Sequence, residues 1–264
     1  MLVLIRGSGD LASGIALRLK HAGIDVVMTD LERPTAIRRT VCFSTALTQG
    51  RFAVEDVSAV RVQVGDVAET LERGEIPVLV DPGAECRFVL RPDAVVDAIL
   101  AKRNLGTRLD FAPVVVACGP GFTAGVDCHA VVETMRGHYL GRVLYQGSAL
   151  PNTGVPGLIG GFAGERVLRT PADGLFHPLL EIGTLVRTGQ AAAVVDGVEM
   201  VCTLDGVLRG ILADGTPVRK GLKAGDIDPR CQPDHCRSVS DKALAVGGGV
   251  LEAVLHFYNR LTHR

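Results

Sequence analysis

The segment Leu2–Asp30 reads LVLIRGSGDLASGIALRLKHAGIDVVMTD and decides the fold. A short apolar run leads into a glycine turn, a helix-like stretch and a second apolar run that ends at Asp30. This order is typical of a strand, a turn, a helix and a second strand. Gly7, Gly9 and Ala12 fill the small-residue positions of the fingerprint G-x-G-x-x-G/A. Asp30 stands where that fingerprint has its ribose-binding acid.

These residues predict a site for a nucleotide or a phosphate group. A phosphate at the turn would meet the free N–H groups of the helix start. The alternative is a strand-helix-strand unit whose turn holds nothing. Asp30 would repel a 2′-phosphate, so NAD is favoured over NADP. Arg38 and Arg39 either hold an anion or lie on a surface helix. The candidate cofactor-binding residues of this segment are Gly7, Gly9, Asp10, Leu11, Ala12, Gly14 and Asp30.

Composition excludes several classes of protein. The chain has 264 residues, of which 47% are hydrophobic, and this favours a globular protein. Its formal net charge is −1 and it lacks tryptophan, which argues against nucleic-acid binding. No apolar run approaches the roughly 20 residues of a membrane span, and no signal peptide is evident. We therefore expect a cytoplasmic protein. Seven scattered cysteines without a CxxC pair predict no metal site.

Strand and helix patterns alternate to about residue 147. The expected fold class is therefore α/β, with a Rossmann-like, mostly parallel sheet covered on both faces. Strands are expected at 60–64, 77–80, 113–117 and 142–146, and helices at 34–50, 66–73, 93–103 and 128–136.

The pattern changes near Pro151. Short β runs between glycine turns predict a small all-β module, and the final helix is expected at 244–261. Three consecutive glycines in that helix suggest close packing against another backbone. The expected domains are a nucleotide-binding domain at 1–150, an inserted β module at 151–230, and a loop and helix at 231–264 that pack back on the first domain.

A second glycine turn follows the strand at 113–117. Its glycines, Gly119, Gly121 and Gly125, are further candidate cofactor-binding residues, since ligands bind at this end of the strands. His129 and Glu133, four residues apart, would share a helical face and are candidate catalytic residues. The alternative is a capping Asp127 before a solvated helix face.

The C-terminal region offers one candidate nucleophile. Cys236 has His235 and Arg237 as neighbours in the sequence, and positive charge lowers the pKa of a thiol. The same region contains a set of charged residues that form either a site or, as we favour, a salt-bridge network: Asp226, Asp228, Arg230, Asp241 and Lys242.

The β module resembles the barrel-sandwich fold of biotinyl and lipoyl carriers in the phrases PADGLFHPLLEIGTLVRTGQAAAVV and LDGVLRGILADGTPVRKGLKAGD. Those carriers present a modifiable lysine at a hairpin tip. The corresponding stretch here, DGVEMVCTLDG, has none, and the module's lysines are Lys220 and Lys223. We therefore expect a lid, a dimer surface or a docking face.

The ordered motifs GSGDLASG, TDLERPTAIRRTVCFS, GPGFTAGVDCHAVVETMRGHYLGRV, GSALPNTGVPG, GDIDPR and SDKALAVGGGVLEA resemble the YqeB family. The resemblance implies an accessory or maturation protein whose partner is a selenium-dependent molybdenum hydroxylase. The first half is also distantly similar to the XdhC maturation factors, which bind molybdenum cofactor. The candidate cofactors are therefore NAD and the nucleotide form of molybdenum cofactor. A homo-oligomer is also expected.

Two other functions stay open. One is an NAD-dependent oxidoreductase with His129 or Lys242 as its acid or base. The other is a non-catalytic scaffold whose β module docks the hydroxylase.

Overall fold

The computed structural model describes residues 1–262, which divide into two compact units. Unit 1 comprises Met1–Pro34, Phe43–Thr153 and the chain from Val239 onwards. Unit 2 comprises Thr35–Cys42 and Gly154–Ser238. The chain therefore enters unit 2 twice, and each unit is built from segments that are far apart in the sequence.

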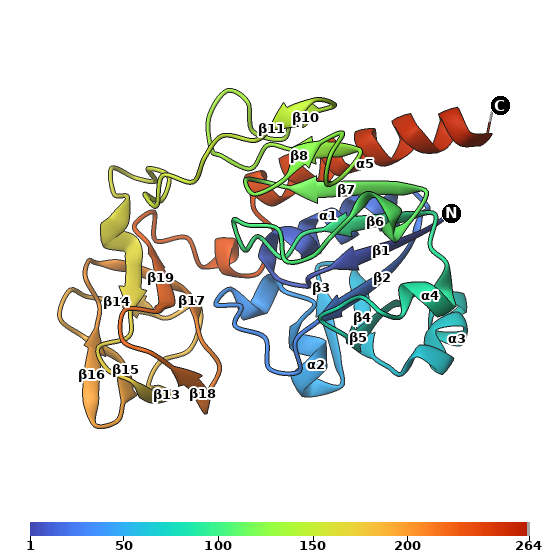
Figure 1. The fold of residues 1–264 in the computed structure, drawn as a ribbon. Helices are drawn as coiled ribbons and strands as arrows, with labels where there is room; N and C mark the ends of the chain where they lie inside the picture. Colours follow the sequence, from blue (N-terminus) through green and yellow to red (C-terminus); the bar gives the residue numbers. More distant parts are fainter. Residues whose placement is uncertain (263–264) are drawn as a thin grey trace. The chain divides into compact units, whose positions relative to one another are not determined.

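Unit 1 is organised around a nine-stranded sheet within the described residues, in the order β10-β9-β7-β6-β1-β2-β5-β4-β3 (Figure 1). The two edge strands, β3 and β10, run antiparallel to their neighbours and the others are parallel. Two short strands, β8 (Thr123–Ala124) and β11 (Gly147–Ser148), pair separately. The nine strands are β1 (Leu2–Arg6), β2 (Asp25–Asp30), β3 (Arg51–Val54), β4 (Val57–Arg61), β5 (Ile76–Val80), β6 (Ala94–Asp97), β7 (Val114–Cys118), β9 (Ala130–Val132) and β10 (Val143–Leu144).

Helices α1 and α5 pack against each other through glycines. A methyl group added at Gly14 would lie 2.5 Å from Cβ of Ala243, and one added at Gly247 would lie 2.8 Å from the carbonyl oxygen of Gly14. The close packing expected for the three glycines of the last helix is thus confirmed for Gly247 and for Gly249, which lies against the backbone of Gly141, but not for Gly248. The helices of unit 1 are α1 (Asp10–His21), α2 (Thr45–Gln49), α3 (Val67–Glu72), α4 (Arg87–Leu90) and α5 (Asp241–Thr262), with 3-10 turns η2 (Val64–Asp66) and η3 (Leu109–Phe111).

The predicted fold class, a Rossmann-like sheet with a barrel-sandwich insert, is wrong. The structure has one large mixed sheet and three antiparallel sheets in place of a mostly parallel sheet with a single inserted module. Helices were expected at 93–103 and 128–136, but these stretches contain strands β6 and β9. The expected alternation of strand and helix therefore stops after β6.

Burial explains both errors. All four residues of β6 and all three of β9 are buried. A strand buried on both faces reads as a continuous apolar run, and so short a run has no periodicity that separates it from a buried helix. The expected helix at 34–50 is wrong for another reason, because Thr35–Cys42 belongs to unit 2 and only α2 and the 3-10 turn η1 (Arg39–Val41) form.

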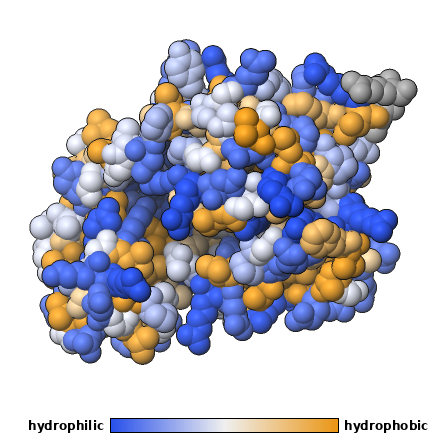
Figure 2. Space-filling model, in the orientation of Figure 1, coloured by the Kyte–Doolittle hydropathy of each residue, from blue (hydrophilic) through white to orange (hydrophobic). Residues whose placement is uncertain are grey.

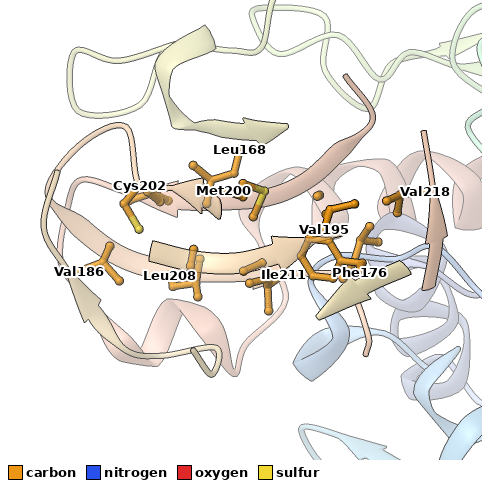
Figure 3. Packing of buried hydrophobic residues seen from close by; sticks show 14 of the residues in the cluster. Leu168, Phe176, Val186, Val195, Met200, Cys202, Leu208, Ile211 and Val218 are labelled. Atoms are coloured by element: carbon orange, nitrogen blue, oxygen red, sulfur yellow. The ribbon is translucent and has the colours of Figure 1, made fainter. Parts of the chain in front are cut away.

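Unit 2 contains two four-stranded antiparallel sheets, β12-β19-β17-β14 and β16-β15-β13-β18. Side chains from both sheets form one apolar core, which includes Phe176, Leu208 and Ile211 (Figure 3). The strands are β12 (Val167–Arg169), β13 (Gly174–Pro178), β14 (Leu185–Val186), β15 (Ala191–Val195), β16 (Val198–Val201), β17 (Gly206–Ile211), β18 (Thr216–Val218) and β19 (Lys223–Asp228), with 3-10 turns η1, η4 (Gly164–Arg166) and η5 (Pro233–Cys236).

The surface of unit 1 carries an apolar patch over α4, at the right of the view in Figure 2. Phe88 and Val89 are 66% and 70% exposed there. The guanidinium of Arg87 lies 4.0 Å from the centroids of the Phe88 and Phe111 rings. A cation thus borders the patch and covers part of its aromatic surface.

Candidate functional site

The first glycine turn joins β1 to α1. Gly7 has a φ of +107°, and a methyl group added to it would lie 2.9 Å from the carbonyl oxygen of Ala98. The backbone N–H and the hydroxyl of Ser8 both donate to Oδ2 of Asp30, at 2.8 and 2.6 Å. Oδ1 of Asp30 accepts from the N–H of Leu31. Asp30 therefore fixes the shape of the turn, and its carboxylate is already in use there.

The start of α1 is open. Gly9 has an extended backbone, supplies no side-chain cap, and has no atom within 4 Å of the position that a Cβ would take. Asp10 and Leu11 are partly exposed. Ala12 and Gly14, in contrast, are buried, and Gly14 packs on α5. Of the four predicted cofactor-binding residues in α1, only Asp10 and Leu11 are thus accessible to a ligand.

The second glycine turn begins after β7. Gly119 and Gly121 have φ values of +80° and +106°, and Gly125 has one of +85°. A methyl group added at Gly119 would lie 2.6 Å from the hydroxyl of Thr134, and one added at Gly121 would collide with the backbone of Arg103. At Gly125, in contrast, no atom lies within 4 Å of the position that a Cβ would take. Gly119 and Gly121 therefore serve close packing.

One loop, 98–103, contacts both turns. Its first residue meets Gly7 and its last meets Gly121. Leu100 and Lys102 within it have φ values of +60° and +63°, a strained conformation for residues other than glycine. The side chains of Lys102 and Arg103 have no hydrogen-bond or ion-pair partner within residues 1–262, and both residues are exposed. The loop that contacts the glycine turns thus carries two cations.

A buried polar cluster, which the sequence did not suggest, anchors this loop. Arg6 donates to the hydroxyl of Thr107 at 2.9 Å, and that hydroxyl donates to Asp97 at 2.6 Å. Burial raises the pKa of Asp97, and hydrogen bonds from Thr107 and the backbone together with Arg6 oppose this effect. The feature of the sequence that could have pointed to this cluster is the charged residue at the end of each apolar run, Arg6 and Asp97.

His129 and Glu133 do not share a face, because β9 separates them. His129 accepts a hydrogen bond through Nδ1 from the N–H of Val115, at the start of β7. It therefore lies at the end of the strands opposite the glycine turns. Glu133 is buried and accepts from the N–H groups of Met135 and Leu150. Both side chains hold backbone in place, and they are not brought together as acid and base.

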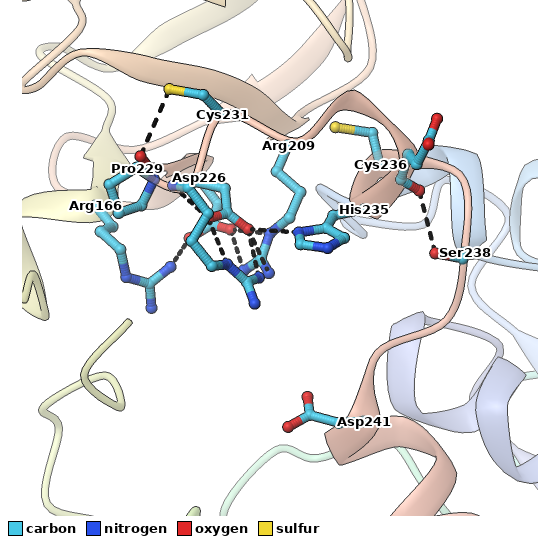
Figure 4. A network of polar contacts seen from close by, with 12 residues as sticks. Arg166, Arg209, Asp226, Pro229, Cys231, His235, Cys236, Ser238 and Asp241 are labelled. Carbon is cyan, nitrogen blue, oxygen red and sulfur yellow. Dashed lines mark hydrogen bonds and ion pairs between the residues drawn. The ribbon is translucent and has the colours of Figure 1, made fainter. Parts of the chain in front are cut away.

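Cys236 is buried in unit 2, in η5 (Figure 4). Burial raises the pKa of its thiol, although Arg38 and Arg209 oppose the effect. A reactive thiol needs the opposite shift and access to solvent. The structure thus argues against the nucleophile that the neighbouring charges in the sequence suggested.

The predicted salt-bridge network lies next to Cys236 (Figure 4). Asp226 accepts from Arg166 at 3.0 Å and from Arg209 at 2.7 Å. Asp228 accepts from Arg230 at 2.6 Å and lies 3.4 Å from Arg209. The other two predicted members, Asp241 and Lys242, belong to unit 1, where Asp241 pairs with Arg136.

Asp228 makes stability depend on acid pH. Its burial opposes ionisation, but Arg230, the backbone and Arg209 outweigh that effect and lower its pKa to about 2. Because the pKa is lower in the folded state, the stabilisation is present above about pH 4 and is lost as the pH falls towards 2. The shift corresponds to roughly 2 kcal/mol of folding stability.

Urea unfolding at a series of pH values tests this assignment. We expect the free energy of unfolding of the native protein to fall between about pH 4 and pH 2, and that of Asp228→Asn to fall by less. An equal loss in both proteins would contradict the assignment.

Metal-binding clusters and membrane-spanning helices are both absent from the described residues. Within residues 1–262, no three His, Cys, Asp or Glu side chains cluster as they would around a metal ion. Of the helices described, none has the length and apolar character needed to cross a membrane.

Comparisons with known proteins identify one close relative. The chain is 53% identical over 255 residues to the uncharacterised protein YqeB of Escherichia coli K12, a match that covers 96% of the chain. The chain spans only about half (47%) of the length of that relative. No family model matches.

Solved structures give weaker likenesses. An aspartoacylase family protein of Mesorhizobium loti is 13% identical, with 86% of this chain and 84% of that chain covered and a TM-score of 0.29. A succinylglutamate desuccinylase/aspartoacylase of Rhodobacter sphaeroides is 15% identical, with 76% and 57% covered and a TM-score of 0.24.

Proposed function

We propose that this chain, whose similarity supports membership of the YqeB family, binds a phosphate-bearing small molecule at the Gly7–Gly9 turn of unit 1. The observation that carries the proposal is the turn itself. Gly7 has a left-handed conformation that brings the backbone against Ala98, while Gly9 faces open space at the uncapped start of α1. Backbone N–H groups at such a start attract phosphate oxygens.

The charges nearby support an anionic ligand. Lys102 and Arg103 lie on the loop that contacts Gly7, and the two cations have no partner among the described residues. Two carboxylates oppose an anion there. That of Asp30 already accepts two hydrogen bonds from Ser8, and Asp10 lies in the first turn of α1. We therefore assign the site to phosphate recognition and leave the role of Asp30 towards a ribose as a prediction.

The geometry argues against His129 as the acid or base of the oxidoreductase alternative, and the role of Lys242 there stays a prediction. His129 is held against Val115 at the far end of the strands from Gly7. An acid or base must lie within hydrogen-bond reach of the reacting group, directly or through one water. The roles that the family resemblance implies, with a selenium-dependent molybdenum hydroxylase as partner, and the homo-oligomer stay predictions. Co-purification of a hydroxylase with the tagged chain would test the partner.

A thermal-shift series tests the proposal. We expect at least one probe among orthophosphate, pyrophosphate, AMP, ADP and NAD to stabilise the protein, by about 2.7 kcal/mol at 100 times its Kd. Gly9→Val should abolish the shift, because the added side chain occupies the open space. Gly65→Val is the matched control, since Gly65 also has open space and lies outside the site.

Two results would count against the proposal. One is a native protein that none of the five probes stabilises. The other is Gly9→Val protein that is folded and still gives the full shift.

A further inference from the structure

A separate cavity of about 390 Å³, wide open to solvent, lies in unit 1 between the crossovers that follow β6 and β7. Cavities of roughly this volume take small-molecule ligands. One wall carries Asn104, Thr107, Arg108 and Asp110, and the other carries Val126 and Asp127. None of these residues takes part in the proposed phosphate site.

The first wall is rigid at its base. Thr107 is completely buried, and its hydroxyl links Arg6 to Asp97. Oδ1 of Asn104 accepts from the N–H groups of Gly106 and Thr107, both at 2.8 Å. A ligand would therefore meet a preformed wall.

Asp127 is oriented by the protein and keeps capacity to accept hydrogen bonds. Its Oδ2 accepts from the N–H of Thr123 at 2.8 Å. Its Oδ1 has only a long contact of 3.3 Å, to the amide of Asn104. Since an ionised carboxylate offers about four acceptor positions, Asp127 can accept further bonds from a ligand.

Asp110 is the second carboxylate. Arg108 donates to it through Nε and Nη2, both at 3.0 Å. These hydrogen bonds lower the pKa of Asp110, which is therefore ionised at neutral pH. Both side chains are about two-thirds exposed, and exposed pairs of this kind contribute little stability. A ligand can therefore replace Arg108 at Asp110 at small cost.

The lining chemistry selects a cation. Asp110 and Asp127 against Arg108 give the lining a net charge of −1. Val126 is 69% exposed and adds apolar surface. We propose that this cavity binds a small organic cation, with an ammonium or guanidinium group on Asp110 and Asp127 and a short apolar body against Val126.

Calorimetric titration of the full chain with butylamine tests this inference, with butyrate and butanol as the anionic and neutral probes. We expect butylamine to bind and the other two probes not to bind. Asp110→Asn should weaken butylamine by about tenfold, the scale of one charged hydrogen bond. Asp25→Asn is the matched control, since Asp25 is exposed at the start of β2, and it should bind like the native protein.

Arg108→Gln provides a test of opposite sign. It removes the internal cation that competes for Asp110, so butylamine should bind several-fold more tightly. Preferential binding of butyrate that Arg108→Gln abolishes would show an anion site and overturn the proposal. Absence of butylamine binding at millimolar concentration, or unchanged affinity in Asp110→Asn, would overturn it as well.

Discussion

Asp226→Ala should lower the free energy of unfolding by about 3–5 kcal/mol. The carboxylate of Asp226 is 4% exposed and lies between Arg166, which is 5% exposed, and Arg209. Without it, Arg166 loses its ion-pair partner in a largely dry site, and Arg209 keeps only Asp228, at 3.4 Å. Removal of one partner from a buried ion pair is costly because the remaining charge has lost its compensation.

The loss should be confined to unit 2. Hydrogen exchange would detect it as faster exchange of the amides in β17 and β19, which pair beside the network. Asp214→Ala is the control, because the pair of Asp214 with His177 is exposed, and its loss should cost less than about 1 kcal/mol. A similar loss of unfolding free energy in both variants would show that the buried network stabilises the protein no more than the exposed pair does.

Gly14→Val should destabilise unit 1 by about 1–3 kcal/mol or more, because it overpacks the contact between α1 and α5. The first added carbon would already lie 2.5 Å from Cβ of Ala243 and 2.9 Å from its carbonyl carbon, and a backbone atom cannot give way cheaply. The two helices would have to move apart.

Gly248→Ala is the matched control for this contact. Gly248 lies in α5 but has no atom within 4 Å of its Cβ position. Alanine there should raise stability by up to about 1 kcal/mol, because glycine is a poor helix former. Urea midpoints at unchanged slope would measure both variants. If Gly14→Val were as stable as the native protein, the close approach of the helices would be wrong.

The local elements of unit 1 with long or complete patterns could be predicted from the sequence. The run from β1 through α1 to β2 has apolar strands, a glycine turn and an amphipathic helix, and it lies where expected. Strand β7 and helix α5 were found for the same reason. The prediction of a helix at 128–136 is wrong, because Ala130, Val131 and Val132 form a buried strand. A run of three apolar residues is too short to show the periodicity that separates a strand from a helix.

In the candidate site, too, some features could be predicted from the sequence and others could not. The conformational demands on Gly7 and Gly121 could be read from the glycine turns, because left-handed backbone favours glycine. The packing role of Gly14 could not be predicted from the sequence, because its partner Ala243 is more than 200 residues away in the chain. The same holds for His129 and Glu133, whose contacts depend on the strand that separates them.

The sequence by itself determined where the backbone turns sharply and which runs are apolar, because these properties depend on neighbouring residues. The tertiary structure alone decided which charges meet, as in the cluster of Arg6, Asp97 and Thr107, and which segments share a unit, as for Thr35–Cys42. The physical reason is that burial and ion pairing arise between segments distant in the chain. No local pattern records such partners, so only the folded chain shows that Asp30 holds a turn and that Cys236 is buried.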